Sequence, residues 1–69
     1  MKIVLNGSEQ EVADSATVAD LLTQTHPDAA TQRGVAVAID RRVVPRSTWA
    51  ETVLTDGARV EFVTAVQGG

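Results

Sequence analysis

The last eleven residues, Arg59 to Gly69, constrain the fold most, because they alternate like a β-strand and then run into two glycines. The alternation predicts one face carrying Val60, Phe62, Thr64 and Val66, and an opposite face carrying Glu61, Val63, Ala65 and Gln67. Glycine loses the most backbone entropy on ordering, so a Gly-Gly end favours a mobile arm. We therefore expect a strand that leads into a thin arm with a free carboxylate. So short a motif also fits a leftover linker or a disordered end, and the rest of the chain has to decide.

The bulk properties restrict the class of protein. Sixty-nine residues allow one small domain. Since there is no cysteine, disulfides, thiolate metal sites, persulfides and thiol nucleophiles are excluded. The apolar run at residues 1–5 is too short for a signal peptide or a membrane span, so we expect a soluble cytoplasmic protein without a membrane partner. The net charge of −3 argues against nucleic acid as a partner.

The first third of the chain predicts a hairpin followed by a helix. Residues 2–5 and 8–12 are short β-prone runs joined by Asn6-Gly7, which suits a type I′ turn. In the first run, Val4 should face away from the core. Thr17 with Asp20 three residues later marks a helix start, and the helix should end before Pro27. Its apolar stripe would consist of Val18, Leu21 and Leu22. A second helical turn over 27–30 belongs to a polar connection.

The middle of the chain predicts two more strands. Residues 35–39 alternate large and small side chains, which puts Ala36 and Ala38 on a smooth face away from the helix. Residues 40–42 should turn the chain into Val43-Val44, and Pro45 should end that strand because it has no N–H to donate.

The following segment should close one end of the core. The run from Pro45 to Trp49 is expected to be a tight, 3₁₀-like connection, with Trp49 covering the core. Residues 52–54 should pack inward, and Asp56-Gly57 should turn into the last strand. The first and last strands are expected to be central neighbours. The fold class is therefore α+β: a β-grasp, with a mixed sheet of four to five strands packed on one main helix, in which residues 1–66 form the domain and 67–69 the flexible tail.

A catalytic constellation is not evident. His26 is the only histidine, stands beside a proline and has no cysteine to pair with, so we interpret it as an ordinary loop residue. No spacing resembles a metal site, and each internal glycine stands alone in a turn. Short carboxylates fall where they can satisfy backbone N–H groups, namely at Asp14, Asp20, Asp40 and Asp56. We therefore expect no enzyme.

One set of segments is distinctive and spans nearly the whole chain: residues 1–7, 16–22, 43–47 and 59–61, together with Trp49, Asp56-Gly57 and Gly68-Gly69. Through these segments the chain resembles the ubiquitin-like family, and within it the ThiS-type sulfur carriers of bacterial thiamine biosynthesis. Two departures stand out. Residues 40–42 form a turn where the family more often has Asn or Gly, and the connection from 26 to 34 is longer than in the shortest members.

The resemblance implies a specific chemistry at Gly69. In the family an E1-like (ThiF-type) adenylating enzyme uses ATP and Mg²⁺ to convert the terminal carboxylate into an acyl-adenylate, so the carrier itself binds no cofactor. Sulfur from a persulfide donor then gives a thiocarboxylate, which a ThiG-type thiazole synthase uses. Gln67 and Gly68 would thread into the partner's site.

The face of the last strand that lies away from the helix is a candidate docking surface. We expect Val63 and Ala65 to lie beside Val4, Ala36 and Ala38 as an exposed apolar patch at the root of the tail. The rim would carry arginines that set the orientation of a partner: Arg59, Arg46 and Arg41.

Two other functions fit the same sequence. The small subunit of molybdopterin synthase shares the fold and the Gly-Gly end, but its run into the tail differs. A ubiquitin-like modifier or a pure binding module is the alternative from another class. Since Lys2 is the only lysine, polymeric chains linked through lysine would have a single side-chain acceptor.

Overall fold

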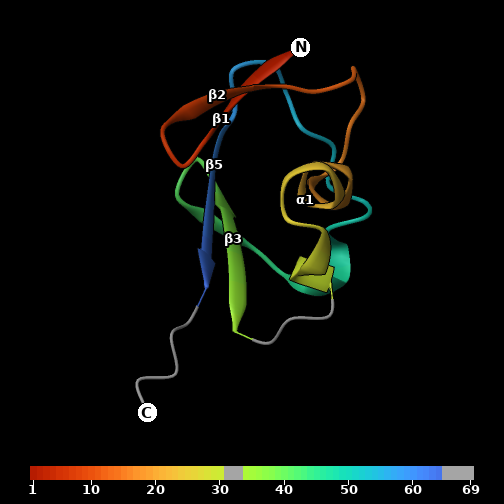
Figure 1. The fold of residues 1–69 in the computed structure, drawn as a ribbon, viewed down its shortest axis with the longest axis vertical. Helices are drawn as coiled ribbons and strands as arrows, with labels where there is room; N and C mark the ends of the chain where they lie inside the picture. The colour runs from red at the N-terminus through yellow and green to blue at the C-terminus, as the bar shows by residue number, and fades with distance from the viewer. Residues whose placement is uncertain (31–33, 65–69) are drawn as a thin grey trace.

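The computed structural model describes residues 1–30 and 34–64. The elements follow in the order β1 (Lys2–Leu5), β2 (Ser8–Glu11), α1 (Val18–Thr25), the 3₁₀ helix η1 (Pro27–Ala30), β3 (Val35–Ile39), β4 (Arg42–Val44), the 3₁₀ helix η2 (Arg46–Thr48) and β5 (Arg59–Thr64). Figure 1 shows the strands beside α1, which is seen almost end-on. The predicted order of elements is confirmed.

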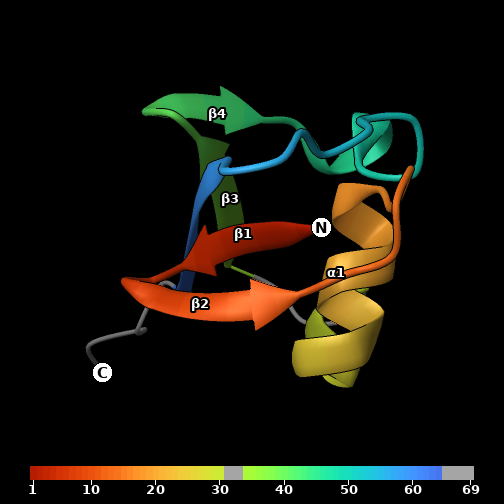
Figure 2. The ribbon, with the colours of Figure 1, turned by 90° about the horizontal axis from the view of Figure 1, so that it is seen from above.

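The five strands form one mixed sheet in the order β2-β1-β5-β3-β4. β1 and β5 run parallel, whereas the other pairs are antiparallel. Seen from above, α1 lies against one face of the curved sheet, with β2 near one edge and β4 near the other (Figure 2). The α+β class and the central pairing of the first and last strands are therefore confirmed.

Two hairpins of the sheet use the same kind of turn. Asn6 and Gly7 have φ values of 49° and 82°, as a type I′ turn requires. Asp40 and Arg41, between β3 and β4, have φ values of 49° and 71°. The second turn adopts the left-handed conformation without a glycine, and Arg42 already belongs to β4 rather than to the turn.

The helix begins and ends as its sequence predicts. The Thr17 hydroxyl accepts from the Asp20 N–H at 3.1 Å, while the Asp20 carboxylate accepts from the Thr17 N–H at 2.9 Å, forming a capping box. The helix ends at its C-cap, His26. Its buried side chains are the predicted stripe of Val18, Leu21 and Leu22.

The core lies between the sheet and α1, and Trp49 belongs to it. Trp49 is 5% exposed, and its indole N–H donates to the Val44 carbonyl at 2.9 Å. The predicted structural role of Trp49 is thus confirmed. The expectation that residues 52–54 all pack inward was wrong for Val53, which is 56% exposed. This stretch is extended, and Val53 forms a β-bridge with Thr17, so successive side chains point to opposite sides. Leu54 is therefore buried, whereas Val53 is not.

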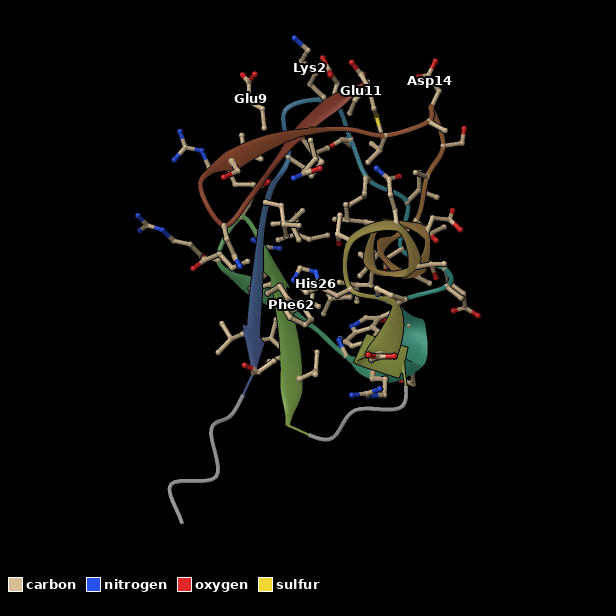
Figure 3. All side chains as sticks on the ribbon, viewed as in Figure 1. Lys2, Glu9, Glu11, Asp14, His26 and Phe62 are labelled. Atoms are coloured by element: carbon tan, nitrogen blue, oxygen red, sulfur yellow. The ribbon has the colours of Figure 1, made fainter. Side chains whose placement is uncertain are left out.

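The register of β5 follows the predicted alternation. Val60 is 1% exposed and Phe62 packs against the core, whereas Glu61 and Val63 are exposed. The Phe62 ring stacks on His26, with the ring centroids 4.1 Å apart and the planes inclined by 26° (Figure 3). His26 is therefore not an ordinary loop side chain, because it covers the last core residue of β5.

Phe62→Ala should lower the free energy of unfolding by about 2–3 kcal/mol, since it removes a partly buried ring and its stacking on His26. Urea denaturation measures this. Val63→Ala is the matched control from the opposite face of the same strand, and it should change stability by less than about 0.5 kcal/mol. Equal effects of the two substitutions would contradict the observed register.

Candidate functional site

The predicted reactive arm lies beyond the part of the chain that the structure describes. Gln67, Gly68 and Gly69, and the predicted docking residue Ala65, fall within residues 65–69. The structure does describe the strand that leads to them, as far as Thr64. The site is therefore built from the end of β5 and the sheet face around it.

The predicted apolar patch is partly assembled on the sheet face that points away from α1. In the antiparallel pairing of β3 with β5, Ala36 lies opposite Val63 and Ala38 opposite Glu61. Val63 is 56% exposed and Ala36 is also exposed, so the two form a bare apolar area close to the end of β5. This placement agrees with the prediction for Val63, Ala36 and Ala38, whose binding role stays a prediction.

Val4 is not part of this area, and the expectation that it lies beside Val63 was wrong. The parallel register pairs Val4 with Arg59 and Leu5 with Val60. Val63 is four residues further along β5, a distance of about 13 Å at the rise of a β-strand. Alternation placed Val4 on the correct face, but it could not supply the register between two strands that are far apart in sequence.

Sequence reasoning missed Val43, which is 74% exposed and lies opposite Ala38 in the pairing of β3 with β4. Part of the signal was present, because alternation must turn one of the adjacent valines Val43 and Val44 away from the core. The structure decides which one, since Val44 packs against the core. We use the name outer apolar surface for the four residues that share this face: Ala36, Ala38, Val43 and Val63.

Two of the three predicted arginines lie together. Arg41 and Arg59 line a depression of about 780 Å³ between the two type I′ turns, which Asp40, Glu61 and Val4 also line. The backbones of β5 and the turn are joined there, because the Asp40 N–H donates to the Arg59 carbonyl at 2.9 Å. The depression therefore carries both charge signs, with the two guanidinium groups on the longest side chains.

Arg46 lies elsewhere, so its predicted place at the rim of the patch needs correction. Its guanidinium group stands 4.7 Å from the centroid of the Trp49 ring. Trp49 packs on the α1 side of the sheet, where its carbonyl accepts from the Ala19 N–H at 3.1 Å. Pro45 and η2 carry the chain to that side, and Arg46 serves there as a cover for Trp49.

Three acidic side chains, those of Glu9, Glu11 and Asp14, lie at the other end of the sheet (Figure 3). The N-terminal ammonium group of Met1 donates to the Val12 carbonyl at 2.7 Å and lies 3.3 Å from carboxylate oxygens of Glu11 and Asp14. The hydrogen bond to Glu11 raises the pKa of this ammonium group above 8.0, against an opposing effect of burial and with the help of Asp14. This cluster lies at the start of β1, far along the sheet from the end of β5.

The described residues offer no sign of bound metal or of a membrane segment. Within residues 1–30 and 34–64, no three His, Cys, Asp or Glu side chains are grouped so that they could hold a metal ion. In the same ranges no helix has the length and apolar character needed to cross a bilayer.

Comparison with known proteins identifies the family. The sequence model of the ThiS family matches residues 3–69. The chain belongs to the ThiS family. The chain is also similar to the sulfur carrier protein ThiS of Escherichia coli (strain K12). The two sequences are 33% identical over 69 residues, and the match covers the full length of both chains.

Solved structures of a ThiS protein support the ubiquitin-like β-grasp fold. The crystal structure of ThiS from Geobacter metallireducens superposes with a TM-score of 0.79 at 31% identity, covering 100% of both chains. A solution structure of a thiamine biosynthesis protein from the same organism gives a TM-score of 0.77, covering 100% of this chain and 88% of the other.

A thiazole synthase contains a similar segment. The enzyme from Paramagnetospirillum magneticum (strain ATCC 700264 / AMB-1) is 38% identical over all 69 residues, but the chain spans only 20% of that protein. A ThiS-like segment therefore makes up about a fifth of a longer protein that bears the name of an enzyme.

Arg41→Gly should raise the free energy of unfolding by about 0.5–1 kcal/mol, because glycine relieves the left-handed conformation at φ 71°. The urea midpoint should rise at constant slope. Arg42→Gly is the matched control, because Arg42 belongs to β4. Glycine in a strand should lower the free energy of unfolding by about 0.5–1 kcal/mol. If both substitutions destabilise the domain, the turn is not strained.

Proposed function

We propose that this chain carries sulfur for thiazole formation in thiamine biosynthesis, on a thiocarboxylate formed at Gly69. The observation that carries the proposal is the ThiS match, which extends to residue 69 of the sequence. The lack of cysteine supports it, because these 69 residues then offer no thiol that could hold the sulfur as a persulfide. As a member of the ThiS family, the chain is a carrier and not a catalyst.

The chemistry requires activation of a carboxylate, whose oxygen is a poor leaving group. A Gly69 carboxylate oxygen attacks the α-phosphorus of ATP, so that an acyl-adenylate forms and pyrophosphate leaves. The terminal sulfur of a persulfide donor then attacks the acyl carbon and AMP leaves. A thiol cleaves the resulting acyl disulfide and supplies two electrons, which leaves the thiocarboxylate on the carrier. ATP and Mg²⁺ belong to the site of the E1-like, ThiF-type partner.

The proposed sulfur acceptor is a ThiG-type thiazole synthase. The support is the segment with 38% identity inside a protein named thiazole synthase. Joining a carrier and its acceptor in one chain raises the effective concentration of one for the other, which is useful only if the two interact. We place the reactions in the cytoplasm, where ATP is available to the adenylating enzyme.

The proposed docking surface is the outer apolar surface, with Ala65 next along the chain. This surface lies near the end of β5. A partner bound to it would hold the sheet in place while Gln67 and Gly68 enter the partner's site. Arg41 and Arg59, in the depression beside it, would select an acidic partner surface and set its orientation. A narrow entrance favours glycine, because the arm then presents no Cβ atom at Gly68.

Intact mass spectrometry tests the function. After incubation with ATP, Mg²⁺, adenylating enzyme, persulfide donor and thiol, the chain should gain about 16 Da, because sulfur replaces one oxygen. Gly68→Val is the matched control: its stability should stay within about 0.5 kcal/mol of the parent, but the chain should gain no mass. An unchanged parent mass would favour a binding module, and a conjugate with another protein would favour a modifier.

Val63→Asp should weaken binding to both the adenylating enzyme and the thiazole synthase by about tenfold or more, because it buries a charge in an apolar contact. Val53→Asp is the matched control, since Val53 has the same 56% exposure but lies in the stretch that bridges to Thr17. Calorimetric titration of the two folded variants decides. Equal affinities would move the docking surface away from Val63.

A further inference from the structure

The pairing of β1 with β5 stops before β5 ends. β1 ends at Leu5, which lies opposite Val60, while β5 continues to Thr64. The other side of β5 stays paired with β3 as far as Thr64. The chain has to leave the ladder at Asn6, because the type I′ turn to β2 begins there with φ 49°.

The Asn6 side chain replaces the missing strand. The backbone N–H of Asn6 donates to the Val60 carbonyl at 2.9 Å, which is the last bond of the ordinary ladder. Its side-chain oxygen Oδ1 then accepts from the Phe62 N–H at 2.8 Å, and its Nδ2 donates to the Phe62 carbonyl at 3.1 Å. In a longer parallel strand the Phe62 N–H would donate to the backbone carbonyl of Asn6, and the Phe62 carbonyl would accept from the backbone N–H two residues after Asn6. One amide group thus extends the ladder by one further step.

This arrangement fixes the orientation of the amide group. The Phe62 N–H needs an acceptor and the Phe62 carbonyl needs a donor, and only one orientation of the Asn6 amide provides both. A carboxylate would satisfy the N–H but repel the carbonyl. Glycine would serve the turn equally well, since it tolerates positive φ, but it would make neither bond. We call the two side-chain hydrogen bonds from Asn6 to the Phe62 backbone the Asn6 clamp. The turn and the clamp are therefore separable functions of one residue.

Phe62, near the end of β5, is held through both its side chain and its backbone. The Phe62 ring faces the helix side and stacks on His26, while its backbone is held by Asn6. Thr64, two residues later, is the last residue of the strand. Without the clamp, one side of β5 beyond Val60 loses these two bonds, and the strand end gains freedom that any partner must remove when it takes the arm.

We infer that Asn6 is a positioning residue for the C-terminal arm: it holds β5 at Phe62 and so fixes the direction in which the chain leaves the sheet. The inference rests on the proposed function, because the direction matters only if residues 65–69 enter a partner's site. It predicts a defect in recognition by the partner without loss of the fold.

The test compares Asn6→Gly, which keeps the turn, with Asn6→Asp, which keeps only the acceptor for the Phe62 N–H. Hydrogen exchange at the Phe62 amide should accelerate by about tenfold in Asn6→Gly and clearly less in Asn6→Asp. The Val63 amide is the internal reference, because alternation points it towards β3. Its exchange should stay within about twofold in both variants, which shows that the sheet itself is intact.

Steady-state adenylation gives the second measurement. The apparent KM for the Asn6→Gly carrier should rise by about three- to tenfold, with kcat within about twofold of the parent. Unchanged Phe62 exchange, an unchanged KM, or a loss confined to kcat would each overturn the inference. A parent chain that is never adenylated would instead remove the proposed function, and the exchange measurement would still show whether the clamp exists.

Discussion

The parallel pairing of β1 with β5 is the contact on which the rest of the structure depends. It joins residues more than fifty positions apart, since Val4 lies opposite Arg59, and it places the last strand in the middle of the sheet. β3 pairs with the other side of β5, so β5 is the central strand of the sheet, with β1 and β3 as its neighbours. The residues beyond Thr64 therefore continue from a strand that β3 pairs up to its last residue, and that β1 and the Asn6 side chain hold on the other side as far as Phe62. The proposed function needs this combination, because a partner could then recognise a fixed sheet and still take in the residues that follow it.

Local features of the fold could be predicted from the sequence, whereas relations between distant segments could not. Thr17 with Asp20, and Asn6 with Gly7, specify a helix start and a turn through their own backbone chemistry. The parallel register is different, because no pattern within either strand says that Val4 lies opposite Arg59 and not Val63. The stacking of His26 on Phe62 is also a contact between distant segments, so the sequence position of His26 suggested an ordinary loop. Val43 was missed in part by inference, since alternation must turn one of the adjacent valines outward, but only the packing of Val44 against the core shows that it is Val43.

The two type I′ turns of the sheet solve the same geometric problem with different residues. Asn6-Gly7 meets the need for positive φ at little cost, and the Asn6 side chain gains two bonds to β5. Asp40-Arg41 meets it with residues that are less suited to that conformation. Arg41 also lines the depression beside the outer apolar surface. A residue that strains its turn and exposes a cation next to a proposed docking surface is better explained by binding than by folding.

The proposed chemistry places a limit on how tightly any partner can hold this chain. The adenylating enzyme and the sulfur acceptor both need the same carboxyl end, so they must bind in turn and each must release the carrier. A large, strongly apolar interface would oppose release, because most differences in affinity between related complexes lie in the dissociation rate. An outer apolar surface built from two alanines and two valines is small, which favours short-lived complexes. Specificity would then rest on charge at Arg41 and Arg59 and on the direction of the arm, which is what the Asn6 clamp would control.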